Sequence, residues 1–199
     1  MHYYIFPTKD NWISSGSNTS TTGVDEKDQN FGQDPILEIK KEFFNSSFDY
    51  QTRALVQFGG SDFISNSVES GDIVNPSYFL RLYETEGTQD LSTEYKIAAL
   101  PISESWDEGT GKFGDNPKVT VGCSFKNRNN FVGAAETNWV NGGATINTSG
   151  SASLQTFSFQ SPDINIDVTD AVKQIFDNSI ENHGFLLRLS GSQETDNNT

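Results

Sequence analysis

Three aspartates near the C-terminus have the residue type and spacing that could support acid–base chemistry. Asp163, Asp167 and Asp170 lie in the segment DINIDVTDAV. Carboxylates act as a general acid and base only when they converge on one cleft. The two-residue period of a strand places Asp163 and Asp167 on one face, and Asp170 follows at the start of a predicted helix. We therefore interpret the three carboxylates as capping and turn groups that satisfy free N–H groups.

The segment Ser105–Gly109 (SWDEG) combines an aromatic ring with two carboxylates. Trp106 could stack on a sugar ring while Asp107 and Glu108 accept hydrogen bonds from its hydroxyls. Adjacent side chains of an extended backbone point apart, however, which makes Asp107 and Glu108 a poor acid–base pair. Anchoring of the loop by Trp106 is the simpler interpretation, and sugar stacking is the alternative.

Cysteine and histidine are too sparse for a nucleophilic or zinc site. The chain has one cysteine, Cys123, and two histidines, His2 and His183, at distant positions. A structural zinc ion needs four such ligands, and a cysteine nucleophile needs a base beside it. The acidic run Asp25–Asp28 lacks the spacing of an EF-hand loop and is interpreted as a solvated loop. We expect no catalytic residue, no metal ligand that can be named and no cofactor; a calcium ion held between distant loops is the alternative.

The charge of the chain argues against several classes of partner. The formal net charge is −14 and the isoelectric point is about 4.3. Nucleic-acid phosphates and anionic membrane surfaces both attract a basic protein face, so we expect neither partner. No apolar run reaches the ~20 residues of a membrane span, and the start MHYYIFPTKD lacks the basic and apolar regions of a secretory signal. The expected location is the cytosol, or a virus particle that is assembled there and released by lysis.

Alternating apolar residues and frequent turn signals predict an all-β fold. The chain has 199 residues with 15 Phe and 17 Gly, and no change in composition divides it, so we expect one domain over residues 1–199. Short runs of β-branched and aromatic residues between polar turns predict antiparallel strands packed as a β-sandwich. The expected strands are residues 3–6, 36–41, 53–58, 78–83, 95–101, 119–125, 154–159, 164–168 and 185–189, with a shorter strand at 12–13.

One amphipathic helix is predicted over about residues 167–178. Its apolar side chains recur at helical spacing, with Asp167 as the N-cap and Asp170 in the first turn. We expect this helix to cover an open end of the sandwich, and only a weak helical or extended turn around residues 63–64. The inward-facing residues are Val168, Ala171, Val172, Ile175 and Phe176.

The long polar loops are the expected places for binding, because loops on a rigid sandwich carry most contacts. They span residues 103–116 and 126–150. The candidate contacts to a partner chain or a glycan are Trp139 and Asn138 in the second loop, Trp12 near the N-terminus, and Tyr50 in an aromatic loop over residues 43–50. Trp139 could equally anchor its loop.

Several motifs in a fixed order resemble a known family. The chain resembles the DNRLRE-type jelly-roll domain, which is similar to one group of carbohydrate-binding modules and occurs in bacterial surface proteins and tailed-phage virions. The start without a leader and the loops SWDEGTGKFGDNP and NWVNGG look most like the versions in virion proteins of T4-like marine phages. The motifs are Asn30–Gly32, Ile36–Lys40, Arg53–Phe58, Phe79–Tyr83, Ser105–Gly109, Asp167–Val172 and His183–Arg188.

The resemblance implies a jelly-roll β-sandwich without catalytic activity, in which Trp106 is structural. It also implies a structural role in a virion, in the tail, baseplate, neck or fibre, with other virion proteins and copies of the same chain as partners. Members of the family usually add one more strand after a segment like Ser190–Asp196. We expect that strand to come from a longer chain or from another chain, the former being preferred. The alternative function is a carbohydrate-binding or host-adhesion module that contacts a host-surface glycan.

Overall fold

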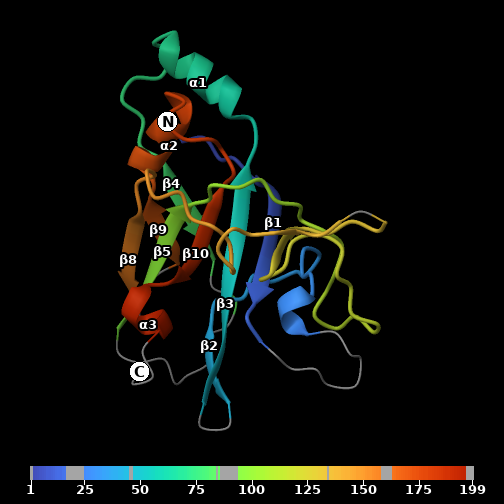
Figure 1. Cartoon of the computed structure of the whole chain (residues 1–199). Helices are drawn as coiled ribbons and strands as arrows, with labels where there is room; N and C mark the ends of the chain where they lie inside the picture. The colour runs from blue at the N-terminus through green and yellow to red at the C-terminus, as the bar shows by residue number, and fades with distance from the viewer. Residues whose placement is uncertain are drawn as a thin grey trace.

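The protein is an antiparallel β-sandwich built around one large and one small sheet, with a further two-stranded pair in a loop (Figure 1). The computed structural model describes residues 2–16, 25–44, 47–83, 85, 94–133, 135–157 and 163–195. The all-β sandwich expected from the sequence is confirmed, because strands dominate and helices are short.

The larger sheet runs through the centre of the molecule and is antiparallel throughout. Its strand pairings bring together segments from both ends of the chain, so that the C-terminal β10 (Phe185–Leu189) lies between β3 (Ser47–Phe58) and β5 (Tyr95–Pro101). β2 (Lys41–Phe44) pairs with the first half of β3 as a hairpin. The order is β1 (Pro7–Ser14), β3 (Ser47–Phe58), β10 (Phe185–Leu189), β5 (Tyr95–Pro101) and β8 (Ser153–Phe157).

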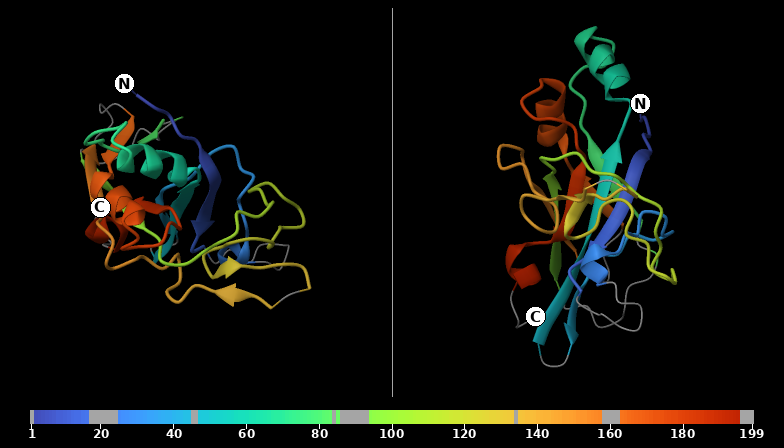
Figure 2. Two further views of the ribbon diagram at one scale, coloured as in Figure 1. Left: turned by 90° about the horizontal axis from the view of Figure 1, so that it is seen from above. Right: turned by 45° about the vertical axis from the view of Figure 1, so that its right-hand side comes forward.

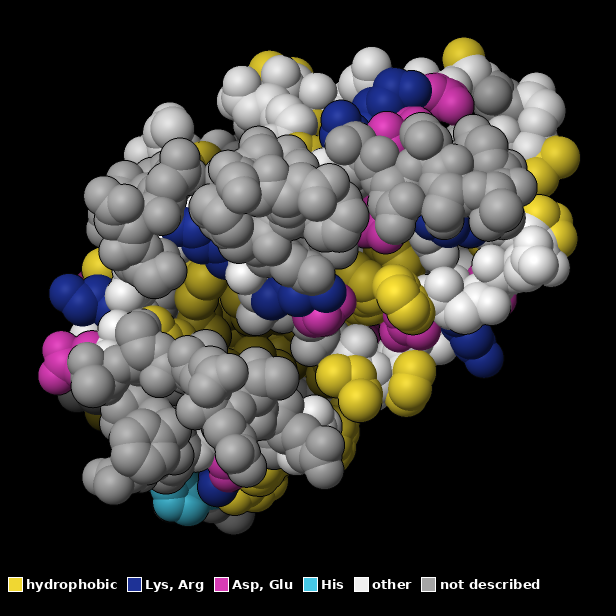
Figure 3. Space-filling view, turned by 90° about the horizontal axis from the view of Figure 1, so that it is seen from below, with side chains coloured by type: hydrophobic (Ala, Val, Ile, Leu, Met, Phe, Trp, Pro, Cys, Tyr) yellow, Lys and Arg dark blue, Asp and Glu magenta, His cyan; other side chains and the backbone are white. Residues whose placement is uncertain are grey.

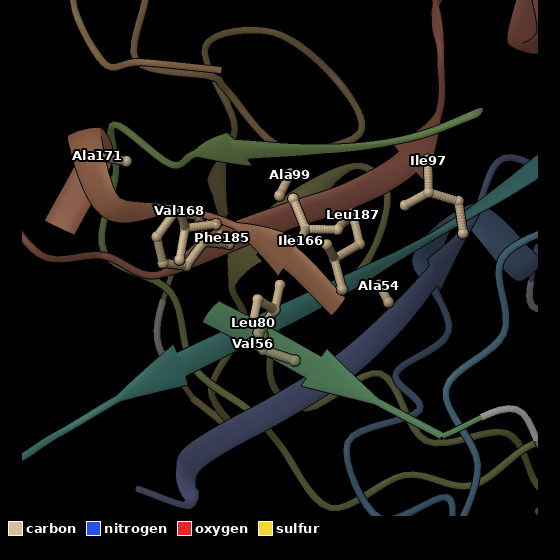
Figure 4. Close-up of a cluster of buried hydrophobic side chains, with 10 residues drawn as sticks. All are labelled: Ala54, Val56, Leu80, Ile97, Ala99, Ile166, Val168, Ala171, Phe185 and Leu187. Carbon is tan, nitrogen blue, oxygen red and sulfur yellow. The ribbon is translucent and has the colours of Figure 1, made fainter. Parts of the chain in front are cut away.

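A small second sheet covers one face of the larger one. β4 (Phe79–Leu82) pairs with β9 (Ile164–Asp167). Leu80 and Ile166 from this sheet meet side chains of β3, β5 and β10 in one buried cluster (Figure 4). Alternation along the strands supplies these side chains, because every second residue faces the same side. The cluster consists of Ala54, Val56, Leu80, Ile97, Ala99, Ile166, Val168, Ala171, Phe185 and Leu187.

The opposite face of the larger sheet is covered by loops rather than by a sheet. In the described part of the segment between β5 and β8, β6 (Asn127–Asn129) and β7 (Thr137–Asn138) are short strands that pair with each other. It supplies large side chains that pack on Leu55 and Leu186 of the larger sheet. This second cluster consists of Ile13, Leu55, Ile102, Trp106, Cys123, Trp139, Ala144 and Leu186.

The predicted C-terminal helix exists but begins and ends inside its expected bounds. α2 spans Thr169–Phe176. Asp167 precedes the N-cap residue, Val168, and its Oδ1 accepts a hydrogen bond from the Thr169 backbone N–H at 2.9 Å. Asp167 therefore forms a side-chain turn before the helix instead of serving as the N-cap residue. Val168 and Ala171 are buried in the first cluster and Val172 packs against it, which confirms the inward face for these three residues. Ile175 and Phe176, also expected to face inward, are only partly buried and lie outside the cluster.

Two further helices were not predicted as such. α1 (Ser61–Glu69) follows β3, where the sequence indicated only a weak turn. α3 (Gly191–Thr195) follows β10, and its Glu194 is buried between Arg53 and Arg188. A 3-10 turn, η1, spans Glu26–Asp28. Figure 2 shows α1 and α2 at the same end of the sandwich.

Three strand predictions and one loop prediction were displaced or wrong. Residues 2–6 lie outside any strand, and β1 begins at Pro7. Residues 36–40 are not in a ladder, although Leu37 and Ile39 pack on the first cluster. Residues 119–125 are irregular, and residues 43–50, expected as a loop, contain the β2–β3 hairpin. Apolar type alone therefore decides neither packing nor pairing: Tyr4 and Phe6 are exposed, whereas Leu37 and Ile39 are packed without joining a ladder.

Candidate functional site

Two of the three C-terminal aspartates take the turn and helix-end positions expected from the sequence. Asp167 and Asp170 are exposed, and the latter lies in the first turn of α2. The side-chain and backbone hydrogen bonds from Thr169 hold the pKa of Asp167 below its usual value. A carboxylate with a lowered pKa is a weak proton donor at neutral pH. This geometry supports the interpretation of these residues as turn and helix-end groups.

Trp106 is a structural anchor. Its side chain is 1% exposed, and its indole Nε1 donates a hydrogen bond to the His183 carbonyl at 2.9 Å. The Lys9 ammonium lies 5.7 Å from the ring centroid. The SWDEG loop is thereby fixed to β1 and to the start of β10.

Two of the candidate contact residues are buried aromatic rings. Trp12 stacks on Phe31 with ring centroids 3.7 Å apart, and its Nε1 donates to Asp34 Oδ2 at 2.9 Å. Trp139 donates from Nε1 to the Ser124 carbonyl at 2.9 Å. Each of the two tryptophans is 4% exposed, so neither presents a flat face to solvent. Trp139 therefore anchors its loop, which was the alternative considered from the sequence, and Trp12 is likewise packed inside the protein.

Of the other two candidate contact residues, Asn138 and Tyr50, the structure describes the side chain of the first alone. Asn138 lies in β7 with an exposed side chain. Tyr50 lies in β3, and its side chain is outside the described residues. The structure therefore does not place Trp12, Asn138 and Trp139 around one open surface.

The acidic loop around Glu108 is fixed by buried amides. Asn30 Nδ2 donates to the carbonyls of Glu108 and Cys123, both at 2.7 Å. Asn30 Oδ1 accepts from the backbone N–H groups of Gly32 and Gly111 at 3.1 and 2.8 Å. Burial raises the pKa of the Cys123 thiol to about 12, so this thiol stays protonated and unreactive at neutral pH.

A groove that the sequence did not reveal lies between α1 and the segment that joins α2 to β10. Its volume is about 550 Å³. α1 contributes one wall, and the last turn of α2 with the following turn contributes the other, at the end of the molecule shown at the top of Figure 1. The lining residues are Ser65, Glu69, Ile175, Phe176, Asn178, Ile180, Glu181 and Asn182.

The groove combines apolar side chains with hydrogen-bonding groups. Phe176 packs edge-on against Tyr78, with ring centroids 5.5 Å apart and an interplanar angle of 85°. Glu181 Oε2 lies 2.8 Å from His183 Nε2 and its side chain is 86% exposed. Asn182 Nδ2 donates to the Phe58 carbonyl at 3.0 Å and fixes the wall to β3. Such a surface can pack on an apolar face of a ligand and hydrogen bond with its polar edge.

The local backbone explains how the second wall is built. α2 ends at Phe176, and Asn178 adopts a left-handed conformation with φ 60°, which asparagine tolerates better than most residues. Asp177 Oδ1 accepts from the Ser179 N–H at 2.9 Å, and the hydrogen bonds from Ser179 keep the pKa of Asp177 below its usual value. In the sequence, DNSIENHG indicates only a polar turn. The other wall of the groove, α1, lies more than a hundred residues away in the sequence, so no local sequence pattern predicts the groove.

The described residues contain no cluster of three or more His, Cys, Asp or Glu side chains placed to hold a metal ion. Among the same residues, no helix is long and apolar enough to cross a membrane. The calcium ion considered from the sequence therefore has no assigned position.

Comparison with known proteins identifies the family. The sequence profile of carbohydrate-binding module family 96 matches residues 2–125, more than half of the chain. No curated protein and no solved structure gave a match. The matched part includes β1 to β5, α1 and the SWDEG loop, while β10, which completes the centre of the larger sheet, follows it. The chain belongs to carbohydrate-binding module family 96, a family of binding modules.

Proposed function

We propose that this domain binds a glycan without cleaving it, and that the groove between α1 and the α2–β10 segment is the binding site. The observation that carries the proposal is the lining of the groove, in which apolar side chains and hydrogen-bonding groups converge. Membership of a carbohydrate-binding family supports the class of ligand.

The groove has the size and chemistry for a short stretch of sugar. Binding sites for small ligands measure roughly 300–1,000 Å³, and this groove has about 550 Å³. Phe176 and Ile175, which are partly exposed, offer contact to the C–H face of a pyranose ring. Ser65 and Asn178 supply hydroxyl and amide groups for sugar hydroxyls.

A glycan array followed by calorimetry tests the proposal. We expect micromolar to millimolar binding to at least one oligosaccharide, which stays intact during long incubation. Asn178→Gly removes the amide while keeping the left-handed backbone that φ 60° requires, and should weaken binding several-fold. Phe176→Ala should weaken it further.

Phe131→Ala is the matched control for Phe176→Ala, because Phe131 is an exposed phenylalanine in the loop layer outside the groove. It should leave the affinity unchanged. Absence of binding to every glycan would refute the proposal, and equal loss in Phe131→Ala would place the site elsewhere. Release of shorter sugars would indicate hydrolysis instead of binding alone.

A second candidate function is assembly into a virion through protein–protein contacts. The observation that favours it is a run of exposed apolar side chains ahead of β1, at the edge of the larger sheet. Tyr4 and Phe6 are 72% and 78% exposed, and Ile5 between them is 43% exposed. Contiguous exposed apolar residues mark interaction surfaces, and the resemblance to phage proteins suggests virion proteins or copies of this chain as partners.

Light scattering of the whole chain and of a Tyr4→Ser, Phe6→Ser variant tests this candidate. Concentration-dependent self-association that the variant abolishes would support it, as would detection of the chain in purified virions. A monomer at all concentrations, together with absence from virions, would eliminate it.

A further inference from the structure

We infer that α1 is a hinged lid, which rotates as a unit about Gly60 and closes over the groove when a glycan occupies it. The inference rests on the proposed function, because it concerns how that same groove holds its ligand. It follows from the way in which each wall of the groove is attached to the sandwich.

The wall between α2 and β10 is attached firmly to the larger sheet. The Asn182 carbonyl accepts a hydrogen bond from Gln57 Nε2 at 2.9 Å, and Asn182 Nδ2 donates to the Phe58 carbonyl at 3.0 Å. Ile180 beside it is 5% exposed. A buried side chain and two hydrogen bonds to the end of β3 keep this wall in place.

The other wall, α1, is packed less closely on the sandwich. The helix projects beyond the sheets at the top of Figure 1. Among the side chains that the structure describes in α1, none belongs to either buried cluster. Ile64 and Val68, which are four positions apart and share one side of the helix, are only partly buried. Little packing therefore holds α1 at one angle to the sheets.

Gly60 has the properties of a hinge at the start of α1. The preceding residue, Gly59, lies so close to β1 that a Cβ atom there would be 2.8 Å from Thr8 Cγ2. Gly60 has a φ of 72°, and a Cβ atom on it would meet nothing within 4 Å. Glycine adopts positive and negative φ with similar ease. The backbone can therefore turn at Gly60 while Gly59 stays packed against β1.

The chain that follows α1 allows the same rotation. The Ile73 N–H donates to the Ser67 carbonyl at 3.0 Å, which ties the turn after α1 to the helix. The chain is fixed again at Tyr78, whose N–H donates to Thr169 Oγ1 at 2.9 Å. The turn therefore moves with α1, and the linker 74–77 joins this unit to the sandwich.

Closure would bring apolar side chains of the two walls together. Val68 follows Ser65 by three residues and precedes Glu69, and both of these line the groove, so Val68 borders the same side of α1. Ile175 and Phe176 on the other wall are also only partly buried. Removing more of these side chains from water around a bound sugar favours the closed state.

Exposed apolar side chains alone would not identify a lid. Hydrophobic side chains also reach the surface at the opposite end of the molecule (Figure 3). What distinguishes α1 is that it forms a groove wall and begins at a glycine with open space around it.

Distances between two spin labels in the whole chain test the motion. One label is placed by Asn66→Cys in α1, or by Lys173→Cys in α2 as the matched control, and the second by Thr156→Cys in β8; all three side chains are exposed. The native Cys123 is buried, which raises the pKa of its thiol to about 12 and keeps it from reacting with the label. Without a glycan, pulsed electron paramagnetic resonance should give an α1–β8 distance distribution about twice as broad as the α2–β8 distribution.

A substitution at the hinge separates rotation at Gly60 from motion elsewhere. Gly60→Asn keeps the left-handed φ accessible but removes most of the other conformations that glycine allows, so the α1–β8 distribution should narrow. The matched control is Gly133→Asn. Gly133 also has a positive φ, 83°, and open space for a Cβ atom, but it lies in the turn between β6 and β7. This control should leave the distribution as broad as in the wild type.

The oligosaccharide that binds most tightly on the glycan array then tests closure. At saturation it should shift the α1–β8 distribution and narrow it to the width of the α2–β8 control. Gly60→Asn should bind this oligosaccharide several-fold more weakly, because a hinge held near the open angle populates the closed state less.

The outcomes distinguish this inference from the proposed function. If no glycan binds, the proposed function fails and the lid fails with it. If a glycan binds but leaves the α1–β8 distribution unchanged, or if both label pairs give equally narrow distributions in the free protein, the proposed function stands and the lid is overturned. A broad distribution that Gly60→Asn does not narrow would overturn the hinge at Gly60.

Discussion

Asn30 shows how much of the loop layer depends on one side chain. Its carboxamide makes four hydrogen bonds, to the carbonyls of Glu108 and Cys123 and from the N–H groups of Gly32 and Gly111. This is the full capacity of an amide group, and the residue is completely buried. A buried polar group of this kind fixes neighbouring backbone segments because any displacement leaves donors or acceptors unpaired.

Asp10 provides a prediction at the same scale. Burial, and then the charge of Glu108, raise the pKa of its carboxyl above the usual value. The folded state therefore favours the protonated form: this contribution to stability is fully present below the unfolded pKa of 3.8 and is lost as the pH rises through the folded pKa. Because Asp10 is partly exposed, solvent screening keeps the effect below about 1 kcal/mol.

Asp10→Asn should consequently stabilise the protein slightly at pH 7 and give no gain at about pH 3.5, near the unfolded pKa. Urea unfolding at the two pH values measures the difference. A variant less stable than the wild type at pH 7, or a gain that is equal at both pH values, would contradict the assignment.

At the scale of elements, α3 fixes the C-terminal part of the chain to the larger sheet. Glu194 pairs with Arg53 of β3, with 2.7 Å between Oε1 and Nε, and with Arg188 of β10. The Glu194 side chain is 3% exposed, and those of Arg53 and Arg188 are 12% and 22% exposed. Arg53 also donates to the Gly143 carbonyl, which links α3 indirectly to the loop layer.

Glu194→Gln should destabilise the protein by about 3 kcal/mol, because two largely buried guanidinium groups lose their counter-charge. The matched control is Glu38→Gln, which breaks a half-exposed pair with Lys40 at 2.8 Å and should cost less than about 1 kcal/mol. Denaturant unfolding gives both values. If both substitutions lowered the free energy of unfolding by the same amount, the burial of Glu194 would not strengthen its ion pairs.

At the scale of the whole molecule, one sheet supports two separate cores. Leu186 and Leu187 are adjacent in β10 and both fully buried, yet they face opposite clusters. The β4–β9 sheet and α2 cover one cluster, and loops cover the other. Since both cores share β3, β5 and β10, loss of packing on either side weakens the same ladder.

The adjacent leucines provide a matched pair of substitutions. We expect each substitution, Leu186→Ala or Leu187→Ala, to lower the free energy of unfolding by about 2–5 kcal/mol. Each variant should still unfold in a single transition. Far-ultraviolet circular dichroism and tryptophan fluorescence should give the same midpoint, because Trp106 and Trp139 report on the loop-covered core. Two separate transitions in Leu186→Ala would show that the loop layer unfolds independently.

The strands with strong local patterns were predictable. Residues 95–101 and 185–189 form strands with the bounds expected from their apolar runs, and the apolar stripe of α2 was read from its spacing. The N-terminal run 3–6 has a strand-like composition, but it does not belong to any strand in the described part of the structure. Trp12 and Trp139 show the same limit at the candidate site, since the residue type does not reveal whether a ring faces solvent or protein.

The sequence by itself determined the all-β class, the negative charge, the absence of a cysteine–histidine metal or nucleophile motif, and the order of motifs that points to the family. These properties depend on composition and on patterns of a few residues. Only the tertiary structure decided which tryptophans are buried, that α3 closes an ion-pair cluster, and that α1 meets the turn after α2 to form a groove. Several of those contacts, such as the pair of Arg53 and Glu194, join residues far apart in the sequence, and their geometry arises from packing that no local pattern encodes.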